Sequence, residues 1–223
     1  MRLRKKKNLN ERLENVKDYL VVMEGSDFYY NPERKKNCMI DIKKTFNNEN
    51  KTYLELGCGK GKFVCEMAQL NPDINYIALE KVPNVIVSAC EKAKEMKLNN
   101  VRFICGSAEN LLLFLEPQTI SKIYLNFSCP YPKHTYRNHR LTNAKFLKLY
   151  RELMLPGSLI EQKTDNKGLF EYSIEELSKD GWTLQNISLD LHNSGYEGNV
   201  MTEYESNFAS QGLPIYRLEA YLK

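Results

Sequence analysis

The sequence predicts an α/β fold in which a mostly parallel, seven-stranded sheet carries helices on both faces. From Lys51 onwards, short apolar runs of strand length alternate with amphipathic segments of helix length. Such alternation is typical of parallel sheets. A glycine-rich turn follows the first run, as in nucleotide-binding folds. The last two runs are separated by only one short helical segment, which predicts a terminal antiparallel pair of strands.

The N-terminal part of the chain is expected to add helices to the side of this fold. Residues 8–22 place apolar side chains on one side of a helix, and residues 33–46 do so less clearly. The segment Ser26 to Pro32, rich in aromatic and helix-breaking residues, separates the two. We therefore expect a basic arm and helical extension over residues 1–48 and a main domain over residues 49–223.

Within the main domain, periodicity and helix-breaking residues set the expected boundaries. Asn71-Pro72 ends the first helix, and Pro156-Gly157 ends the fourth. In the second helix, Val85, Ala89 and Ala93 recur on one buried face. The expected strands are 51–56, 74–79, 101–105, 120–127, 158–163, 182–191 and 215–222. The expected helices are 61–70, 83–97, 107–115, 142–154, 168–179 and 201–210.

Composition and charge exclude several classes of protein. The chain of 223 residues is 42% hydrophobic and 27% charged, which is ordinary for a globular protein. No apolar run approaches the roughly 20 residues that span a bilayer, and no secretory signal is visible. Six cysteines form no C-x-x-C pair. These features predict a reduced, cytoplasmic protein without a disulfide framework or a metal site, acting as a monomer or homodimer.

The positive charge is concentrated in two places. The net charge is only +4, but Arg2, Arg4 and Lys5 to Lys7 form a basic arm, and residues 133–140 form a basic loop. A segregated basic surface is typical of proteins that bind nucleic acid. For the arm alone, a solvated terminus is an equally good interpretation.

The glycine-rich turn indicates a nucleoside-binding site. Gly57, Gly59 and Gly61 alternate directly after a strand, and Glu55 lies two residues before the first glycine. The next strand ends at Glu80, about twenty residues further on, where an acid commonly holds a ribose diol. The spacing differs from the G-x-G-x-x-G of dinucleotide folds, so an NAD-dependent oxidoreductase is the least favoured alternative. A carboxylate at Glu55 would repel a pyrophosphate but can pair with the ammonium group of S-adenosylmethionine.

Three later loops contain candidate residues for an acceptor. After the fourth strand, Lys133, Arg137 and Arg140 can meet phosphates, while Tyr131 and Tyr136 can stack on a base. A proline-stiffened surface loop is the alternative interpretation. Asp165 follows the fifth strand, where it could equally cap the next helix. Residues 202–205 combine carboxylates, a hydroxyl and an aromatic ring, although an acidic helix start explains them equally well.

Taken together, these motifs closely resemble those of the bacterial tRNA (guanine-N7)-methyltransferases, over essentially the whole chain. The resemblance implies a Rossmann-like class I methyltransferase fold, S-adenosylmethionine as the donor and a guanosine in the variable loop of tRNA as the acceptor. It also implies no membrane partner. The most specific parts are Glu55–Gly61, Asn126 to Lys133, Lys163 to Asn166, Leu189 to Asn193 and Met201 to Glu205.

The same resemblance implies roles for individual residues. The residues implied to bind the cofactor are Glu55, Gly57, Gly59, Gly61, Glu80, Ser107 and Cys129. Substrate binding falls to Lys133, Asp165, Thr202, Glu203, Tyr204 and Glu205. Cys129 occupies the position that the family uses for catalysis.

Two departures from the family pattern affect these roles. Cys129 stands where the motif usually has an aspartate, and Ser107 stands where an acid near the adenine is frequent. Serine can still hydrogen-bond, so the cysteine is the more serious change. An alternative is a tRNA-binding homologue in which Cys129 has weakened or abolished catalysis. A methyltransferase for another RNA or a small molecule is a further alternative, less favoured by the whole-chain resemblance.

Overall fold

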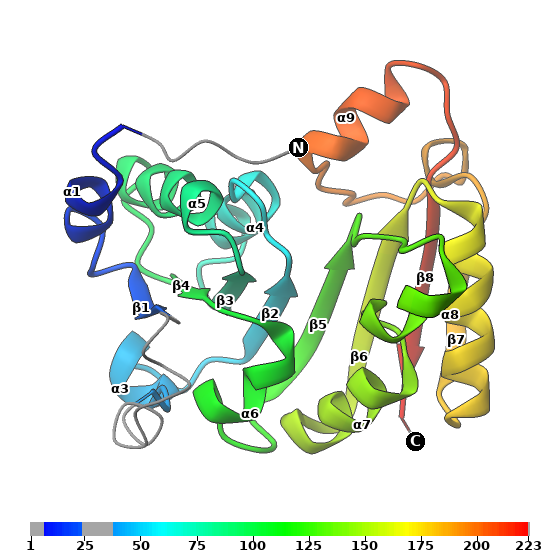
Figure 1. Cartoon of the computed structure of the whole chain (residues 1–223), viewed down its shortest axis with the longest axis horizontal. Helices are drawn as coiled ribbons and strands as arrows, with labels where there is room; N and C mark the ends of the chain where they lie inside the picture. The colour runs from blue at the N-terminus through cyan, green and yellow to red at the C-terminus, as the bar shows by residue number, and fades with distance from the viewer. Residues whose placement is uncertain (1–6, 24–37, 223) are drawn as a thin grey trace. The chain divides into compact units, whose positions relative to one another are not determined.

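The computed structural model describes residues 7–23 and 38–222, which form two compact units (Figure 1). One unit lies within Met1–Glu116 and the other within Pro117–Lys223, and each is described by itself. Most of the predicted basic arm, Arg2 to Lys6, lies outside the described residues. So do the Ser26 to Pro32 segment and the first part of the predicted helix 33–46.

The first unit is built on four parallel strands in the order β1-β4-β3-β2. Its core is apolar: Ile77, Ala78, Val101 and Phe103 are completely buried. Helices α4 and α5 pack against each other and against β3 and β4. The strands are β1 (Leu20–Met23), β2 (Thr52–Leu56), β3 (Asn75–Glu80) and β4 (Val101–Cys105); the helices are α1 (Leu9–Glu14), α3 (Ile42–Phe46), α4 (Lys62–Leu70), α5 (Pro83–Glu95) and α6 (Leu111–Phe114), with a 3₁₀ turn at Ala108–Asn110.

Strand β1 corrects the prediction of one helix over residues 8–22. Helix α1 ends at Glu14, and Leu20–Met23 instead pair in parallel with β4. The amide of Phe103 donates to the carbonyl of Tyr19 at 2.8 Å, which leads the chain into this pairing. Val21 and Val22 are β-branched and favour a pleated strand over a helix. The described residues therefore contain eight strands, not the predicted seven.

The second unit continues the alternation and ends in the predicted antiparallel pair. Its strand order is β5-β6-β8-β7, with β5 parallel to β6 and with β8 antiparallel to both β6 and β7. Helices α7 and α8 pack together against β6. The strands are β5 (Ile120–Asn126), β6 (Met154–Thr164), β7 (Thr183–Ser188) and β8 (Tyr216–Tyr221); the helices are α7 (Ala144–Leu153), α8 (Lys167–Lys179) and α9 (Glu203–Ala209), with 3₁₀ turns at His134–His139 and Leu191–Asn193.

Strand β6 begins earlier than predicted, at Met154 and not at residue 158. The register between β5 and β6 shifts between Ile120 and Lys122. The irregularity accommodates Pro156 and Gly157, of which Gly157 has a φ of +74°. A glycine tolerates that conformation at little cost. Pro156 and Gly157, predicted to end the fourth helix, therefore lie at a break in the ladder of β6, and α7 ends before them at Leu153.

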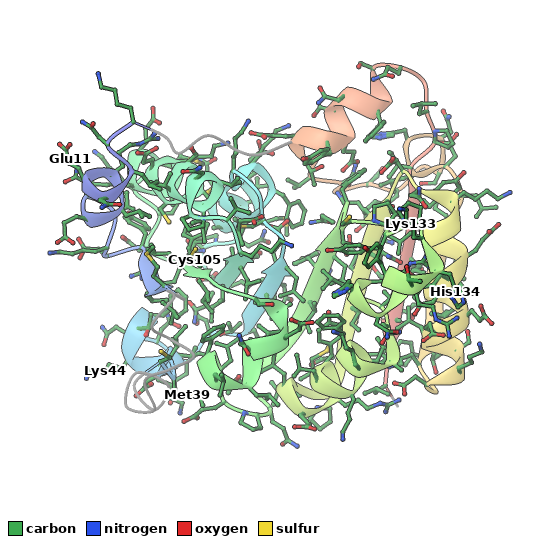
Figure 2. The ribbon with its side chains drawn as sticks, in the orientation of Figure 1. Glu11, Met39, Lys44, Cys105, Lys133 and His134 are labelled. Atoms are coloured by element: carbon green, nitrogen blue, oxygen red, sulfur yellow. The ribbon has the colours of Figure 1, made fainter. Side chains whose placement is uncertain are left out.

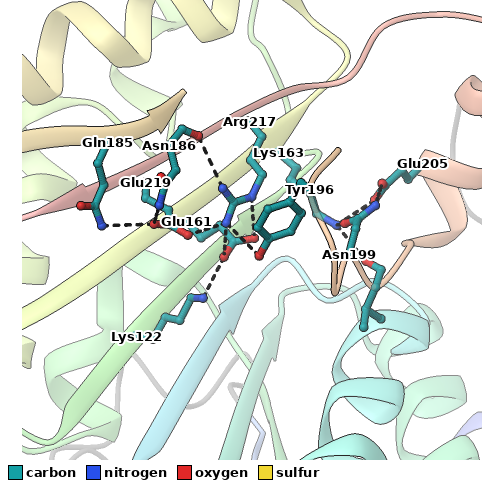
Figure 3. A network of polar contacts seen from close by, with 11 residues as sticks. Lys122, Glu161, Lys163, Gln185, Asn186, Tyr196, Asn199, Glu205, Arg217 and Glu219 are labelled. Carbon is teal, nitrogen blue, oxygen red and sulfur yellow. Dashed lines mark hydrogen bonds and ion pairs between the residues drawn. The ribbon is translucent and has the colours of Figure 1, made fainter. Parts of the chain in front are cut away.

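One face of the second unit's sheet carries a buried ionic network (Figure 3). Lys122 Nζ donates to Glu161 Oε2 at 2.7 Å, and the Arg217 guanidinium nitrogen lies 3.1 Å from the same oxygen. Arg217 also donates to Glu219, and its guanidinium lies 4.0 Å from the Tyr196 ring centroid. Burial alone would raise the pKa of the Glu161 carboxyl, but the charges of Lys122 and Arg217 prevail and lower it.

We predict that Glu161→Gln destabilises the protein in a pH-dependent way. At pH 7 the loss of two charge-assisted hydrogen bonds should cost about 2 kcal/mol of unfolding free energy. A lowered folded-state pKa stabilises the fold above the unfolded pKa and ceases to do so as pH falls through the folded value. The difference between wild type and variant should therefore shrink below about pH 4. Urea unfolding at several pH values measures it, and a difference that stays constant down to pH 3 would contradict the assignment.

Candidate active site

The glycine turn between β2 and α4 is shaped to leave room for a ligand. Gly57, Gly59 and Gly61 all have positive φ, at +81°, +58° and +76°. A side chain added at Gly57 or Gly59 would meet nothing within 4 Å among the described residues, whereas one added at Gly61 would lie 2.7 Å from Ala89 Cβ. The first two glycines thus expose backbone to an open space, and the third lets α4 approach α5.

Backbone hydrogen bonds join this turn to the end of the neighbouring strand. The amides of Gly57 and Cys58 both donate to the carbonyl of Leu79, at 2.7 and 3.0 Å. The amide of Gly106 in turn donates to the carbonyl of Glu80 at 3.2 Å. Consequently the carboxyl ends of β2, β3 and β4 lie at one edge of the sheet, where ligands of α/β folds bind.

Two acids and a serine from these strand ends belong to the same edge. Glu55 is buried on β2. Glu80 ends β3, and its carboxylate accepts a hydrogen bond from the amide of Val82 at 3.0 Å. Burial raises the pKa of the Glu80 carboxyl, while bonds from backbone amides, including that of Gly59, act in the opposite direction. Ser107 follows β4 and caps the Ala108–Asn110 turn. The unit therefore brings together the predicted cofactor residues Glu55, Gly57, Gly59, Gly61, Glu80 and Ser107.

The loop that follows β5 in the second unit is held in an uncommon backbone conformation. Phe127 and Tyr131 have φ values of +49° and +41°, which non-glycine residues rarely adopt. The amide of Phe127 donates to the carbonyl of Lys163 at 2.8 Å. Cys129, between these two residues, exposes its thiol to solvent. Non-glycine residues held in this region cluster at functional sites.

Arg140 stabilises this conformation from the far end of the loop. Its Nε donates to the carbonyl of Pro130 at 2.9 Å, and its Nη2 donates to the carbonyl of Tyr131 at 3.0 Å. The guanidinium also lies 4.4 Å from the Tyr172 ring centroid. Arg140 thus holds the loop itself, a role the sequence did not predict, and its expected contact with phosphate stays a prediction.

The remaining basic side chains of the loop face outwards. Lys133 and His134 are exposed (Figure 2). Arg137 contacts His134 Nε2 at 2.9 Å. The Tyr131 and Tyr136 rings both lie near the His139 ring, with centroids 5.5 and 6.1 Å away. Lys133 is thus an accessible cation on a loop of fixed shape, as its predicted contact with substrate requires.

Asp165 lies at the carboxyl end of β6 but does not cap the next helix. That role belongs to Asn166, whose side chain accepts from the amide of Leu169 at 2.8 Å. The amide of Asn166 is itself held by the Thr164 hydroxyl at 3.1 Å. Asp165 is half-buried. The capping interpretation of Asp165 is therefore wrong, and a ligand-binding role at this strand end remains a prediction.

The residues predicted to bind substrate at 202–205 divide into two groups. Thr202 and Glu205 are buried and form a capping box at the start of α9. Glu203 is half-buried and Tyr204 is exposed, and the Tyr204 ring stacks on Phe127 with centroids 6.4 Å apart. On the described side chains, Glu203 and Tyr204 are the accessible members of this group, while Thr202 and Glu205 hold the helix start.

The contacts of Lys163 were not predicted from sequence. This β6 lysine is almost completely buried, and its Nζ lies 2.7 Å from Glu205 Oε2. A lysine inside a central strand is rarely buried unless it is paired, and this was the only sequence signal available. The role of Phe127 and the loop-holding contacts of Arg140 were missed for a related reason, since they depend on contacts made across the fold.

The described residues contain no group of three or more histidine, cysteine, aspartate or glutamate side chains that could hold a metal ion. None of the described helices is long and apolar enough to cross a membrane.

Comparison with known proteins identifies the class and then the family. Residues 49–218 match a family model described as "Putative methyltransferase". The crystal structure of the 16S rRNA methyltransferase KamB superposes with a TM-score of 0.57 at 17% identity, covering 90% of this chain and 95% of that one. At this identity the likeness shows the fold alone: a Rossmann-like fold with a mostly parallel sheet. Together with the glycine turn and its two acids, fold and family define an S-adenosylmethionine-dependent methyltransferase.

Two curated relatives identify the family. The tRNA (guanine-N(7)-)-methyltransferase of Clostridioides difficile (strain 630) is 47% identical over 175 residues, covering 78% of this chain and 82% of the relative. The protein of the same name from Bacillus subtilis (strain 168) is 49% identical over 174 residues with the same coverage. The chain belongs to the tRNA (guanine-N7)-methyltransferase family.

We predict that alanine substitutions in the glycine turn have unequal effects on stability. Both Gly57→Ala and Gly61→Ala place a side chain at positive φ, which costs about 1–2 kcal/mol. Only Gly61→Ala adds an overlap with the α5 backbone, because Ala89 Cα lies 3.0 Å from the added atom. Denaturant unfolding should therefore show the larger loss for Gly61→Ala, with Gly57→Ala as its matched control. Equal losses would mean that α4 can move away from α5 without cost.

Proposed function

We propose that this chain transfers a methyl group from S-adenosylmethionine to N7 of a guanosine in the variable loop of tRNA. The observation that carries the proposal is the near 50% identity to two curated tRNA (guanine-N(7)-)-methyltransferases over more than three quarters of the chain. The turn and acids of the first unit support the donor, and the basic loop of the second unit supports a polyanionic acceptor.

The residues of the first unit suit the proposed donor. Gly57 and Gly59 leave space for the cofactor to approach the backbone. Glu55 would pair with the donor's ammonium group and Glu80 would bind its ribose diol. Ser107 can hydrogen-bond near the adenine. When bound, S-adenosylmethionine supplies an electrophilic methyl group on a sulfonium centre.

The chemistry at guanine N7 makes modest demands on the protein. This nitrogen carries a free lone pair at neutral pH, so its methylation requires no general base. What the chain must provide is alignment of acceptor and donor. Lys133 would contact tRNA, Tyr204 offers an exposed ring for stacking, and Asp165 and Glu203 can stabilise the positive charge that develops on the base.

Cys129 distinguishes this chain from the motif it otherwise follows. Cys129 brings no carboxylate to the position of the usual aspartate, but a reaction that needs no general base can proceed without one. The chain is therefore an active enzyme, slower than relatives whose aspartate helps to stabilise the positive charge that develops on the base. The second candidate function, a tRNA-binding homologue without turnover, rests on the same substitution.

Domain organisation and cellular context belong to the same proposal. The division at residue 48 separates an N-terminal extension, whose described part includes helix α1, strand β1 and helix α3, from a methyltransferase domain over residues 49–223. The protein acts in the cytoplasm, where its tRNA acceptor is found, as a monomer or homodimer.

The direct test is methyl transfer from labelled S-adenosylmethionine to unmodified tRNA, followed by mapping of the product. A single N7-methylguanosine in the variable loop is expected. Cys129→Ser should retain turnover, and Asp165→Ala should reduce it by about 100-fold, with Asp165→Asn as the variant of matched shape. Binding of cofactor and tRNA without transfer would instead establish the tRNA-binding function.

A further inference from the structure

Three acceptor segments of the second unit meet at one residue of β6, Lys163, whose side-chain contacts with Asn199 and Glu205 are drawn in Figure 3. Lys163 immediately precedes Thr164-Asp165 in the chain. Its carbonyl accepts a hydrogen bond from the amide of Phe127. Phe127 begins the loop that carries Cys129 and Lys133. The Lys163 side chain binds the segment 199–205, which carries Glu203 and Tyr204. One residue thus contacts or adjoins every segment to which a role in acceptor binding is assigned.

The Lys163 side chain is satisfied by partners within the second unit. Its Nζ donates to Glu205 Oε2 at 2.7 Å, to Asn199 Oδ1 at 3.0 Å and to the Val200 carbonyl at 2.8 Å. An ammonium group has three donors, and these partners account for all of them. Since Lys163 and Glu205 side chains are 1% and 0% exposed, neither charge is placed to contact RNA.

The carboxylate of Glu205 is satisfied in the same way. Asn199 Nδ2 donates to Oε1 at 2.5 Å, and the Thr202 amide donates to Oε2 at 3.4 Å. Asn199 therefore bridges the ion pair, since its amide oxygen binds Lys163 and its amide nitrogen binds Glu205. The loop preceding α9 is closed onto β6 by charge-assisted bonds, and such bonds are stronger than neutral ones.

Aromatic contacts join helix α9 to the loop that follows β5. Tyr204, the residue before Glu205, stacks on Phe127, whose ring also stacks on Phe208 with centroids 6.2 Å apart. Holding α9 at its buried start therefore fixes the exposed Tyr204 ring relative to the loop of Cys129 and Lys133.

We propose that Lys163 and Glu205 are positioning residues: their buried ion pair sets the geometry of the three acceptor segments, and neither residue touches the tRNA. The proposal rests on the function proposed above and replaces direct substrate binding by Glu205. It predicts that breaking the pair weakens productive tRNA binding while cofactor binding is unchanged.

The experiment separates positioning from simple stabilisation. Lys163→Met leaves the buried Glu205 carboxylate without its lysine counter-ion and with the His192 ring, 3.5 Å from Oε1, as its neighbour, which should lower Tm by about 10 °C. It should also raise the KM for tRNA by about tenfold, because small displacements of binding groups are costly. The double variant Lys163→Met/Glu205→Gln carries neither charge. It should regain most of the lost Tm while its KM for tRNA stays raised and its Kd for S-adenosylmethionine equals that of wild type.

Lys122→Met is the matched control. It removes another lysine–glutamate contact of the same unit, in which Lys122 lies 2.7 Å from Glu161 and outside the acceptor segments. It should lower Tm and leave the KM for tRNA unchanged. If Lys163→Met does not fold, two other variants take its place: the double variant and Asn199→Ala. Asn199→Ala removes only the bridging amide. Both variants should raise the KM for tRNA.

Two outcomes would overturn the proposal. One is recovery of both Tm and tRNA KM in the double variant, which would reduce the pair to a stabilising contact. The other is an equal rise of KM in Lys122→Met. Wild type assayed in parallel tests the function itself: without N7-methylguanosine in wild type the proposed activity fails, and the dissociation constant for tRNA then replaces KM as the readout of positioning.

Discussion

The buried Lys163–Glu205 ion pair is the interaction on which the acceptor side of the site depends. Two charges removed from water are stable only when every donor and acceptor between them is used. Here Asn199, Val200 and Thr202 supply hydrogen bonds to the pair, and His192 Nε2 lies 3.5 Å from Glu205 Oε1. The hydrogen bonds of this ion pair restrict the conformation of residues 199–205. The buried pair therefore determines where the accessible side chains of Glu203 and Tyr204 lie.

A second constraint acts on the backbone around the strand ends. In the first unit, glycines adopt positive φ where a ligand needs access, which costs little. In the second, Phe127 and Tyr131 adopt it without that freedom, and such conformations persist only when their surroundings enforce them. The Lys163 carbonyl and the Arg140 guanidinium supply that enforcement. None of these contacts uses the side chain of Cys129, so they do not depend on which residue stands at position 129.

Much of the fold could be predicted because it depends on local patterns. Strand and helix periods identify the alternating elements, and Glu55 with the glycines identifies the donor turn. What sequence patterns do not reveal depends on distant partners. The short strand Leu20–Met23 exists because it pairs with β4. Glu205, placed by its motif among substrate-binding residues, is fully buried because it meets a lysine 42 residues away in the chain. The two carbonyl partners of Arg140 lie nine and ten residues away in the chain, and only the fold reveals them.

The most direct test of this account is amide hydrogen exchange in wild type, Lys163→Met and Lys122→Met. Residues 199–209 should lose protection in Lys163→Met alone, because only that variant releases the start of α9 from β6, while the amides of β5 and β6 remain protected. Equal loss of protection in both variants, or none in either, would contradict the claim that Lys163 holds the acceptor segments together.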